Sequence, residues 1–238
     1  MEFIPVKTRV LLPPQDDLYA VLREALPPLQ NGDVILISSK VVAIHQGRCL
    51  KIADVDKGAL IAASADFIIH REYTKAPLTV THHAFLGAAG IDESNGAGHY
   101  ILLPEDSFSF AEKMYHYLQT QYGLTELGVI ITDSHSAPFR YGATGVALAW
   151  WGINPMEDHR GRTDLFGREI QYERSNLVDG LAAGAVVVSG EVDECIPVVI
   201  ARGVPRLTFT TENTKEQLLV PYQEDYFRVL FEKFIPKD

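Results

Sequence analysis

The sequence predicts an α/β protein of the mixed α+β type. Short apolar runs, such as residues 34–37 and 129–132, have the length and composition of buried strands. Between them, apolar residues recur at helical spacing behind capping residues. The two kinds of element alternate too irregularly for a doubly wound sheet, and the sequence shows no internal repeat.

Composition and charge narrow the classes of function. The 238 residues include 21 Lys and Arg against 31 Asp and Glu, a net charge of −10, with 47% hydrophobic residues. This hydrophobic content excludes a disordered chain, and the acid excess argues against a nucleic-acid partner. The apolar runs are too short to span a bilayer, so no membrane partner is expected. Two distant cysteines and no leader-like N-terminus predict a cytoplasmic protein.

The first third of the chain predicts a helix and a strand. Asp16 and Asp17 can cap a helix that runs to about Leu26. A turn at Asn31-Gly32 leads into the strand at residues 34–37, which ends in Ser38-Ser39-Lys40. Residues 60–85 predict a short helix and a strand through 78–80. Four glycines in residues 87–98 then exclude a regular element there.

The remaining elements follow from capping and periodicity. Ser109 and Glu112 have capping-box spacing for a helix that Gly123 stops. Asp133 lies just past the strand at 129–132, and the small, apolar residues 142–152 are expected inside. Ser175 can cap the next helix, and a strand at 196–200 follows. The C-terminal helix is marked by Tyr222, Tyr226, Phe227, Leu230 and Phe234.

Three acidic residues are candidate metal ligands. Asp92, Asp133 and Glu191 each lie in a glycine-rich loop or just beyond a strand, where open α/β folds place their sites. Carboxylate and hydroxyl oxygens suit Mg²⁺ or Mn²⁺, especially when a phosphate completes the coordination shell. The alternative is that each carboxylate is a cap or turn residue.

Other candidate groups are weaker. Lys40 can neutralise phosphate or be a solvated lysine, and Arg140 can bind an anion or form a surface ion pair. Cys195 follows two acidic residues that disfavour a thiolate, so a buried structural cysteine is expected. Asp133-Ser134-His135 has the residue types of a catalytic triad, but their adjacency argues against one.

Seven segments, taken together and in this order, resemble the coenzyme F-420:γ-L-glutamyl ligase family. They are residues 32–42 (GDVILISSKVV), 88–95 (AAGIDESN), 102–106 (LLPED), 129–134 (VIITDS), 158–161 (DHRG), 164–169 (DLFGRE) and 190–197 (GEVDECIP).

The resemblance implies a nucleotide-dependent ligase that forms a γ-glutamyl amide through an acyl phosphate. It implies GTP or ATP as cosubstrate, Mg²⁺ or Mn²⁺ with K⁺ as an optional further cation, and an intertwined homodimer. Residues 1–238 would form one catalytic unit, in which two intertwined subdomains can be distinguished. The implied metal ligands are Asp92, Asp133, Ser134 and Glu191, and Lys40 is the candidate catalytic group. The implied nucleotide contacts are Arg9, Leu11, Leu12, Ser39, Lys40, Asn95, Gly190, Val192, Asp193, Glu194 and Ile196.

Departures from the family pattern bear on the acceptor. Where the family has F-G-R-P-W, this chain has HSAPF at residues 135–139. Ser134 stands in place of the usual Thr after the second metal-binding Asp, and Ile44 stands in place of a lysine. Because these changes fall at pocket positions, we prefer a folate acceptor extended at its terminal carboxylate, with L-glutamate as the added amino acid. The alternatives are a deazaflavin acceptor, as in a coenzyme F-420-0:L-glutamate ligase, and a non-catalytic relative that binds nucleotide or metal. A hydrolase using Ser134 and His135 is a further alternative.

Overall fold

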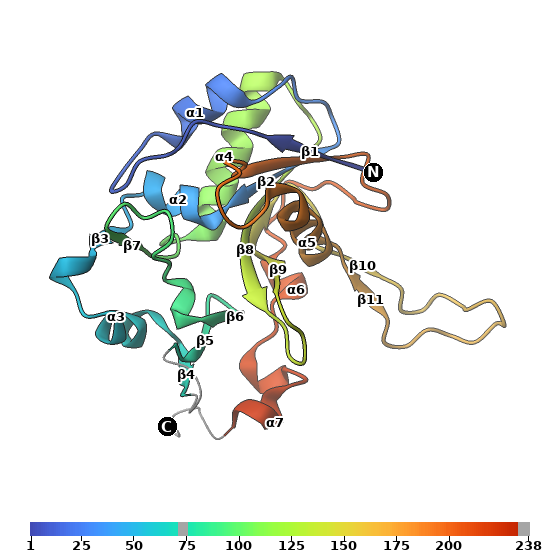
Figure 1. The fold of residues 1–238 in the computed structure, drawn as a ribbon. Coiled ribbons are helices and arrows are strands. Elements are labelled where there is room, and N and C mark those ends of the chain that lie inside the picture. Colours follow the sequence, from blue (N-terminus) through green and yellow to red (C-terminus); the bar gives the residue numbers. More distant parts are fainter. Residues whose placement is uncertain (71–75, 233–238) are drawn as a thin grey trace.

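A five-stranded mixed sheet organises the molecule (Figure 1). The computed structural model describes residues 1–70 and 76–232. The sheet order is β1 (Glu2–Val6), β12 (Val198–Arg202), β2 (Asp33–Ser38), β8 (Leu127–Ser136) and β9 (Ala143–Trp151). Only β2 and β8 run parallel within it, and the other neighbours are antiparallel. This confirms the mixed α+β fold that the irregular alternation predicts.

Helices cover both faces of this sheet. Ile35, Ile37 and Val129 point to one face, where α1 (Leu18–Ala25), α2 (Ser39–His45) and α4 (Ser107–Tyr122) pack. Val34, Leu36 and Ile130 alternate to the other face, where α5 (Leu177–Ser189) and the end of α6 (Lys215–Leu218) pack. The central strands are apolar along their length because both faces are covered.

A smaller lobe carries the remaining short elements, which lie beside the sheet in Figure 1. It contains the pair of β3 (Cys49–Lys51) with β7 (His99–Ile101), and a three-stranded sheet of β4 (Phe67–Ile69), β5 (Leu78–Thr81) and β6 (Ala84–Gly87). Helix α3 (Lys57–Ser64) and the 3₁₀ turns η1 (Ile52–Asp54) and η2 (Ala88–Gly90) connect them. The expected strand at 78–80 is confirmed, whereas η2 places one short turn of helix in the glycine-rich stretch.

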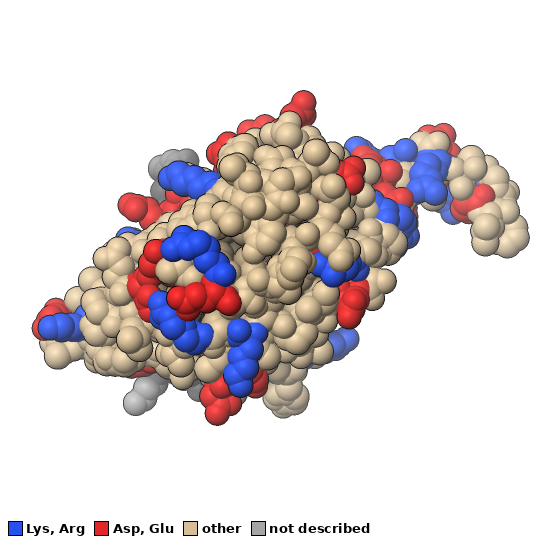
Figure 2. All heavy atoms as spheres, turned by 90° about the horizontal axis from the view of Figure 1, so that it is seen from above, with Lys and Arg blue, Asp and Glu red and all other residues tan. Residues whose placement is uncertain are grey.

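A two-stranded arm projects from the body. It is built from β10 (Met156–Asp158) and β11 (Arg174–Asn176), and Figure 2 shows it as a narrow extension with charged side chains along its length. Leu165, Phe166 and Tyr172 are 97%, 95% and 84% exposed on it. Side chains of this size and polarity are more often buried in folded proteins.

Two of the predicted helix starts differ in detail. Asp17 caps α1 as expected, and Gly123 ends α4 in the left-handed conformation. The cap of α4 is Asp106, not Ser109, because the Asp106 carboxylate accepts from the Ser109 amide. Likewise Asn176, not Ser175, caps α5 by accepting from the Asp179 amide. Both corrections follow from counting back three residues from the amide that needs an acceptor.

The structure also corrects three other elements. Ser39 and Lys40 do not end the strand but begin α2, and β8 continues through Asp133 to Ser136 with a bulge at Ile131/Thr132. The expected C-terminal helix is two short pieces, η3 (Tyr222–Glu224) and α7 (Arg228–Phe231). Of its marker residues, Phe234 lies outside the described residues. None of the described helices is both long and apolar enough to cross a membrane.

A buried ion pair fixes the centre of the sheet. Asp33 is fully buried and accepts two hydrogen bonds of 2.7 Å from the Arg202 guanidinium, which joins β2 to β12. We expect Arg202→Met to lower the free energy of unfolding by about 3 kcal/mol, because it leaves a buried carboxylate without its cation. This corresponds to a fall in Tm of roughly 6–12 °C in a scanning calorimeter. A fall no larger than that of the exposed-site variant Arg23→Met would contradict it.

Candidate functional site

A cavity of about 470 Å³ opens where the carboxyl ends of β2 and β8 meet. Because the two strands are parallel and Ser38 pairs with Thr132, the residues that follow them emerge side by side. Ser39 and Lys40 begin α2 directly after β2, and Asp133 and Ser134 lie in β8. Two loops complete the walls, residues 90–95 and residues 189–197.

Asp133 is the most strongly perturbed acid in the cavity. Burial raises the pKa of its carboxyl to about 6, against the lowering effect of hydrogen bonds from the Ser134 amide and the Ser39 side chain. Asp92 raises this pKa further through its charge, and Lys40 lowers it. A carboxylate held in such surroundings gains from any cation that joins it.

Lys40 reaches across the cavity to the glycine-rich loop. Its ammonium lies 2.5 Å from the Asp92 carboxylate and donates to the Ser94 carbonyl and hydroxyl at 3.2 and 3.1 Å. Although burial acts to raise the pKa of Asp92, the hydrogen bonds from Lys40 and Ser94 outweigh it and hold that pKa below its usual range. The site therefore combines an ionised Asp92 with an Asp133 that burial makes less acidic.

The two loops are joined to each other and to β8. The Asn95 side-chain amide donates to the Val192 carbonyl at 2.7 Å, and the Ser134 hydroxyl donates to Glu191 at 3.2 Å. Glu194 folds back to accept from the Val192 amide, and backbone amides lower its pKa. The loop 189–197 is thus preorganised around its own backbone, with Glu191 turned to the cavity.

The backbone conformation of this loop requires a glycine at position 190. Its φ of 74° and ψ of −178° lie in a region that is open essentially only to glycine, and a Cβ there would lie 2.1 Å from the Glu194 carboxyl carbon. We expect Gly190→Ala to displace the loop and to weaken nucleotide binding at least tenfold in a calorimetric titration. The matched control is Gly180→Ala on α5, where a Cβ would meet nothing within 4 Å. Equal nucleotide affinity in both variants would contradict the role of this loop.

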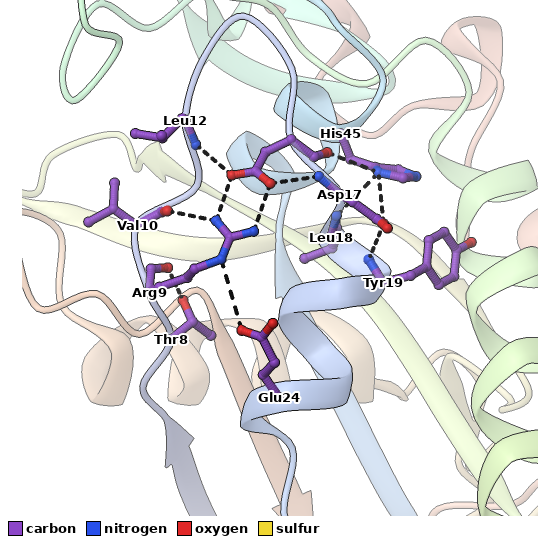
Figure 3. A network of polar contacts seen from close by, with 10 residues as sticks. Thr8, Arg9, Val10, Leu12, Asp17, Leu18, Tyr19, Glu24 and His45 are labelled. Carbon is purple, nitrogen blue, oxygen red and sulfur yellow. Dashed lines mark hydrogen bonds and ion pairs between the residues drawn. The ribbon is translucent and has the colours of Figure 1, made fainter.

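Arg9 is committed to a different partner. Its guanidinium donates to both oxygens of Asp16 at 2.6 and 2.8 Å, in the network that Figure 3 shows at the start of α1. Asp16 also accepts from the amides of Leu12 and Asp17, and these contacts, the Arg9 hydrogen bond foremost, lower its pKa. Arg9 lines the cavity while its charged end holds this N-terminal segment in place.

The structure brings nearly all of the predicted metal ligands and nucleotide contacts together around this cavity. One predicted residue, Leu12, does not line the cavity and is 62% exposed. Cys195 lines it and is half-buried rather than buried, whereas His135 and Arg140 lie outside. The predicted residues that line the cavity are Arg9, Leu11, Ser39, Lys40, Asp92, Asn95, Asp133, Ser134, Gly190, Glu191, Val192, Asp193, Glu194 and Ile196.

Sequence reasoning missed Ser94 as a site residue. Its signal was present, because Ser94 lies two residues after Asp92, a spacing at which a hydroxyl and an amide can return to an Asp side chain. The apolar walls, including Val41, Ile44 and Val186, carry no signal that separates them from core residues.

The carboxylates do not form a closed metal cage. Among residues 1–70 and 76–232, no three His, Cys, Asp or Glu side chains are close enough together to hold a metal ion. Asp92 and Asp133 nevertheless offer oxygen ligands to the same cavity, with the Ser134 hydroxyl and Glu191 beside them. Such a donor set fits Mg²⁺ or Mn²⁺, since these ions are commonly held by one or two carboxylates together with substrate phosphates. The assignment of these four residues as metal ligands remains a prediction.

This geometry defines a class of protein: a mixed α+β fold with an acidic, lysine-containing cavity at the ends of its parallel strands. Comparison with known proteins then gives the family. Residues 6–203 match the family model described as F420-0:Gamma-glutamyl ligase.

Named relatives align over most of the chain. The coenzyme F420:L-glutamate ligase of Methanothermobacter thermautotrophicus is 33% identical, covering 89% of this chain and 90% of the relative. The protein of the same name from Methanocaldococcus jannaschii is also 33% identical, covering 84% and 86%. The one from Methanococcus maripaludis is 40% identical over a shorter stretch, covering 63% and 60%. The chain therefore belongs to the F420-0:gamma-glutamyl ligase family, which supports an enzyme that adds glutamate.

Proposed function

We propose that this chain is a nucleotide-dependent ligase that joins L-glutamate to the terminal carboxylate of a deazaflavin acceptor. The observation that carries the proposal is the convergence of Lys40, Asp92, Asp133 and Glu191 on one cavity. A ligase that activates a carboxylate with nucleotide must hold several anionic groups together. A fixed ammonium and carboxylates that can recruit cations are suited to that task.

The acceptor differs from the one that the sequence favours. The preference for folate rests on departures at pocket positions, whereas the relatives are named for coenzyme F420. Two of those departures lie away from the centre of the cavity, because residues 135–139 do not line it and Ile44 contributes only to its apolar wall. The third, Ser134, lines the cavity but keeps the hydroxyl of the usual threonine. We therefore place the deazaflavin acceptor first and make folate an outcome of the test.

The chemistry proceeds in two balanced steps. An oxygen of the acceptor carboxylate attacks the γ-phosphorus of GTP or ATP, and the nucleoside diphosphate leaves with the electrons of the broken bond. The amine of L-glutamate then attacks the acyl phosphate carbonyl, phosphate leaves, and the nitrogen loses a proton. Lys40 can offset phosphate charge in the first step because its ammonium lies inside the cavity.

Divalent cations are suited to neutralise the phosphate charge that Lys40 does not offset. Asp92, Asp133 and Glu191, with the Ser134 hydroxyl, are the residues that would hold Mg²⁺ or Mn²⁺, and the ions would supply neutralisation of the nucleotide phosphates. K⁺ is an optional further cation that no described residue singles out.

Release of nucleoside diphosphate tests the reaction. With GTP or ATP, Mg²⁺ or Mn²⁺ and L-glutamate, we expect stoichiometric release only when the acceptor is added. Parallel reactions with a deazaflavin precursor and with a folate identify the acceptor, and the two nucleotides identify the cosubstrate. Nucleotide binding without turnover on any acceptor would instead favour a non-catalytic relative.

We further propose that the chain acts as a homodimer in which the arm contacts a second copy. Leu165, Phe166 and Tyr172 on the arm are almost fully exposed in one copy, although charged residues flank them. We expect light scattering to give the mass of a dimer for the wild type and of a monomer for Phe166→Asp. Tyr226→Asp, at an equally exposed aromatic outside the arm, is the control. A monomeric wild type would overturn this part of the proposal.

A further inference from the structure

A second, smaller cavity lies on the other side of the glycine-rich loop. Its volume is about 220 Å³, and Arg48, Ser64, Thr81 and His82 are its polar lining residues. This is about half the volume of the larger cavity, so it suits a molecule of amino-acid size. Leu102 separates it from the larger cavity and lines both.

Arg48 is the charged group of this cavity. Its Nε donates to the Leu103 carbonyl at 3.3 Å, and among the described residues no hydrogen-bond partner engages the two terminal nitrogens of the guanidinium. In the part of the chain that the structure describes, no carboxylate lies within ion-pair distance of it. An arginine that is half-buried, lines a cavity and lacks a carboxylate partner is well suited to bind an anion in fork geometry.

Thr81 supplies an independent observation. It is only 2% exposed, yet the partner of its hydroxyl is Thr79 Oγ1 at 3.5 Å, which is at the limit of a hydrogen bond. Thr79 is itself satisfied by the Leu86 carbonyl and the Ala89 amide. The Thr81 hydroxyl is therefore a nearly unpartnered buried donor beside the cavity, a condition that normally costs free energy.

His82 completes the polar side of the cavity. It occupies the turn between β5 and β6 with a φ of 53°, an uncommon conformation that holds the imidazole at this position. Burial, with Arg48 and His83 adding to it, lowers the pKa of His82, while Asp66 and Asp106 act in the opposite direction. A bound anion would act to raise the pKa of His82, and its binding would change the NMR resonances of the imidazole.

We infer that this cavity is a binding site for a small anion, a carboxylate or phosphate group carried by a molecule no larger than an amino acid. The guanidinium of Arg48 pairs with the anion, and the hydroxyl of Thr81 donates to it. Because Leu102 and the loop at residues 89–92 lie between the cavities, the site is separate from the one that carries the proposed ligation. Its occupancy does not depend on nucleotide.

The test observes the His82 imidazole by NMR, with His82→Gln to assign its resonances. L-Glutamate and inorganic phosphate are titrated separately into the full chain without nucleotide or acceptor. We expect at least one of them to shift the His82 resonances saturably, and the one that does so identifies the chemistry as carboxylate or phosphate. No saturable shift with either probe overturns the inference.

Two variants and two controls localise the binding. Arg48→Met should weaken it tenfold or more, and the nearly isosteric Thr81→Val should weaken it severalfold while keeping the cavity shape. Arg23→Met, on the exposed face of α1, is the control arginine, and Lys40→Met should leave the His82 shift intact because it alters the other cavity. Unchanged affinity in Arg48→Met and Thr81→Val overturns the inference. If Arg48→Met does not fold, Thr81→Val decides alone.

Discussion

Asp133→Asn should reduce ligation by at least a hundredfold while the protein stays folded. The substitution keeps the size of the side chain and the hydrogen bond from the Ser134 amide, but it removes the charge that would hold a divalent cation beside the nucleotide phosphates. Loss of charge stabilisation at transferring phosphates has effects of this size. Steady-state release of nucleoside diphosphate measures the change.

The buried surroundings of Asp133 also predict how Asp133→Asn affects stability, which serves as the control for correct folding. Burial raises the pKa of this carboxyl to about 6, above that of the unfolded chain, so folding opposes its ionisation at neutral pH. The asparagine variant should therefore unfold at a temperature no lower than the wild type when metal and nucleotide are absent. Full activity in the variant would contradict the metal assignment, and a large fall in Tm would show a structural role instead.

Lys40→Met should lower kcat by about tenfold to a hundredfold and weaken nucleotide binding. The variant keeps a side chain of similar length but removes the ammonium that lies 2.5 Å from Asp92 and holds Ser94 through two hydrogen bonds. Both the fixed positive charge and the position of the glycine-rich loop are then lost. Initial rates and calorimetric titration with nucleotide measure the two effects.

The chain offers a matched control for this lysine. Lys57 binds Glu93, the neighbour of Asp92, at 2.9 Å from outside the cavity. Lys57→Met removes an ion pair to the same loop without removing a charge from the site, so its activity should stay within about threefold of the wild type. Equal losses in both variants would show that Lys40 acts only by tethering the loop.

The sequence carried enough information for the core of the fold and for most of the residues that line the candidate site. The runs at 34–37 and 129–132 predict two buried strands, and because these strands are parallel, the residues after them meet. Periodicity could not reveal that Ser39 begins a helix. When a short apolar helix directly follows a buried strand, the sequence of the two together looks like a single apolar segment. It could not reveal that β8 continues past Asp133 either, because that depends on pairing with β9 across a bulge.

Contacts between distant segments lay beyond sequence reasoning. Arg9 is predicted to contact nucleotide, but its guanidinium forms an ion pair with Asp16, and nothing in the pattern of residues 9–16 predicts that pairing. That Arg48 has no carboxylate partner among the described residues is likewise visible only once β5 and α3 are placed beside it. Residue types predict which side chains have the chemistry to bind a ligand. The fold decides which of these side chains are already engaged by other residues.

The mass of the product tests the central claim most directly. The chain is incubated with L-glutamate, GTP or ATP, Mg²⁺ or Mn²⁺ and the deazaflavin precursor, and the acceptor is analysed by mass spectrometry. We predict a gain of one or more glutamyl residues on the acceptor, dependent on nucleotide and divalent metal and absent in Asp133→Asn. No gain on the deazaflavin with either nucleotide, or a gain on folate alone, would contradict the account.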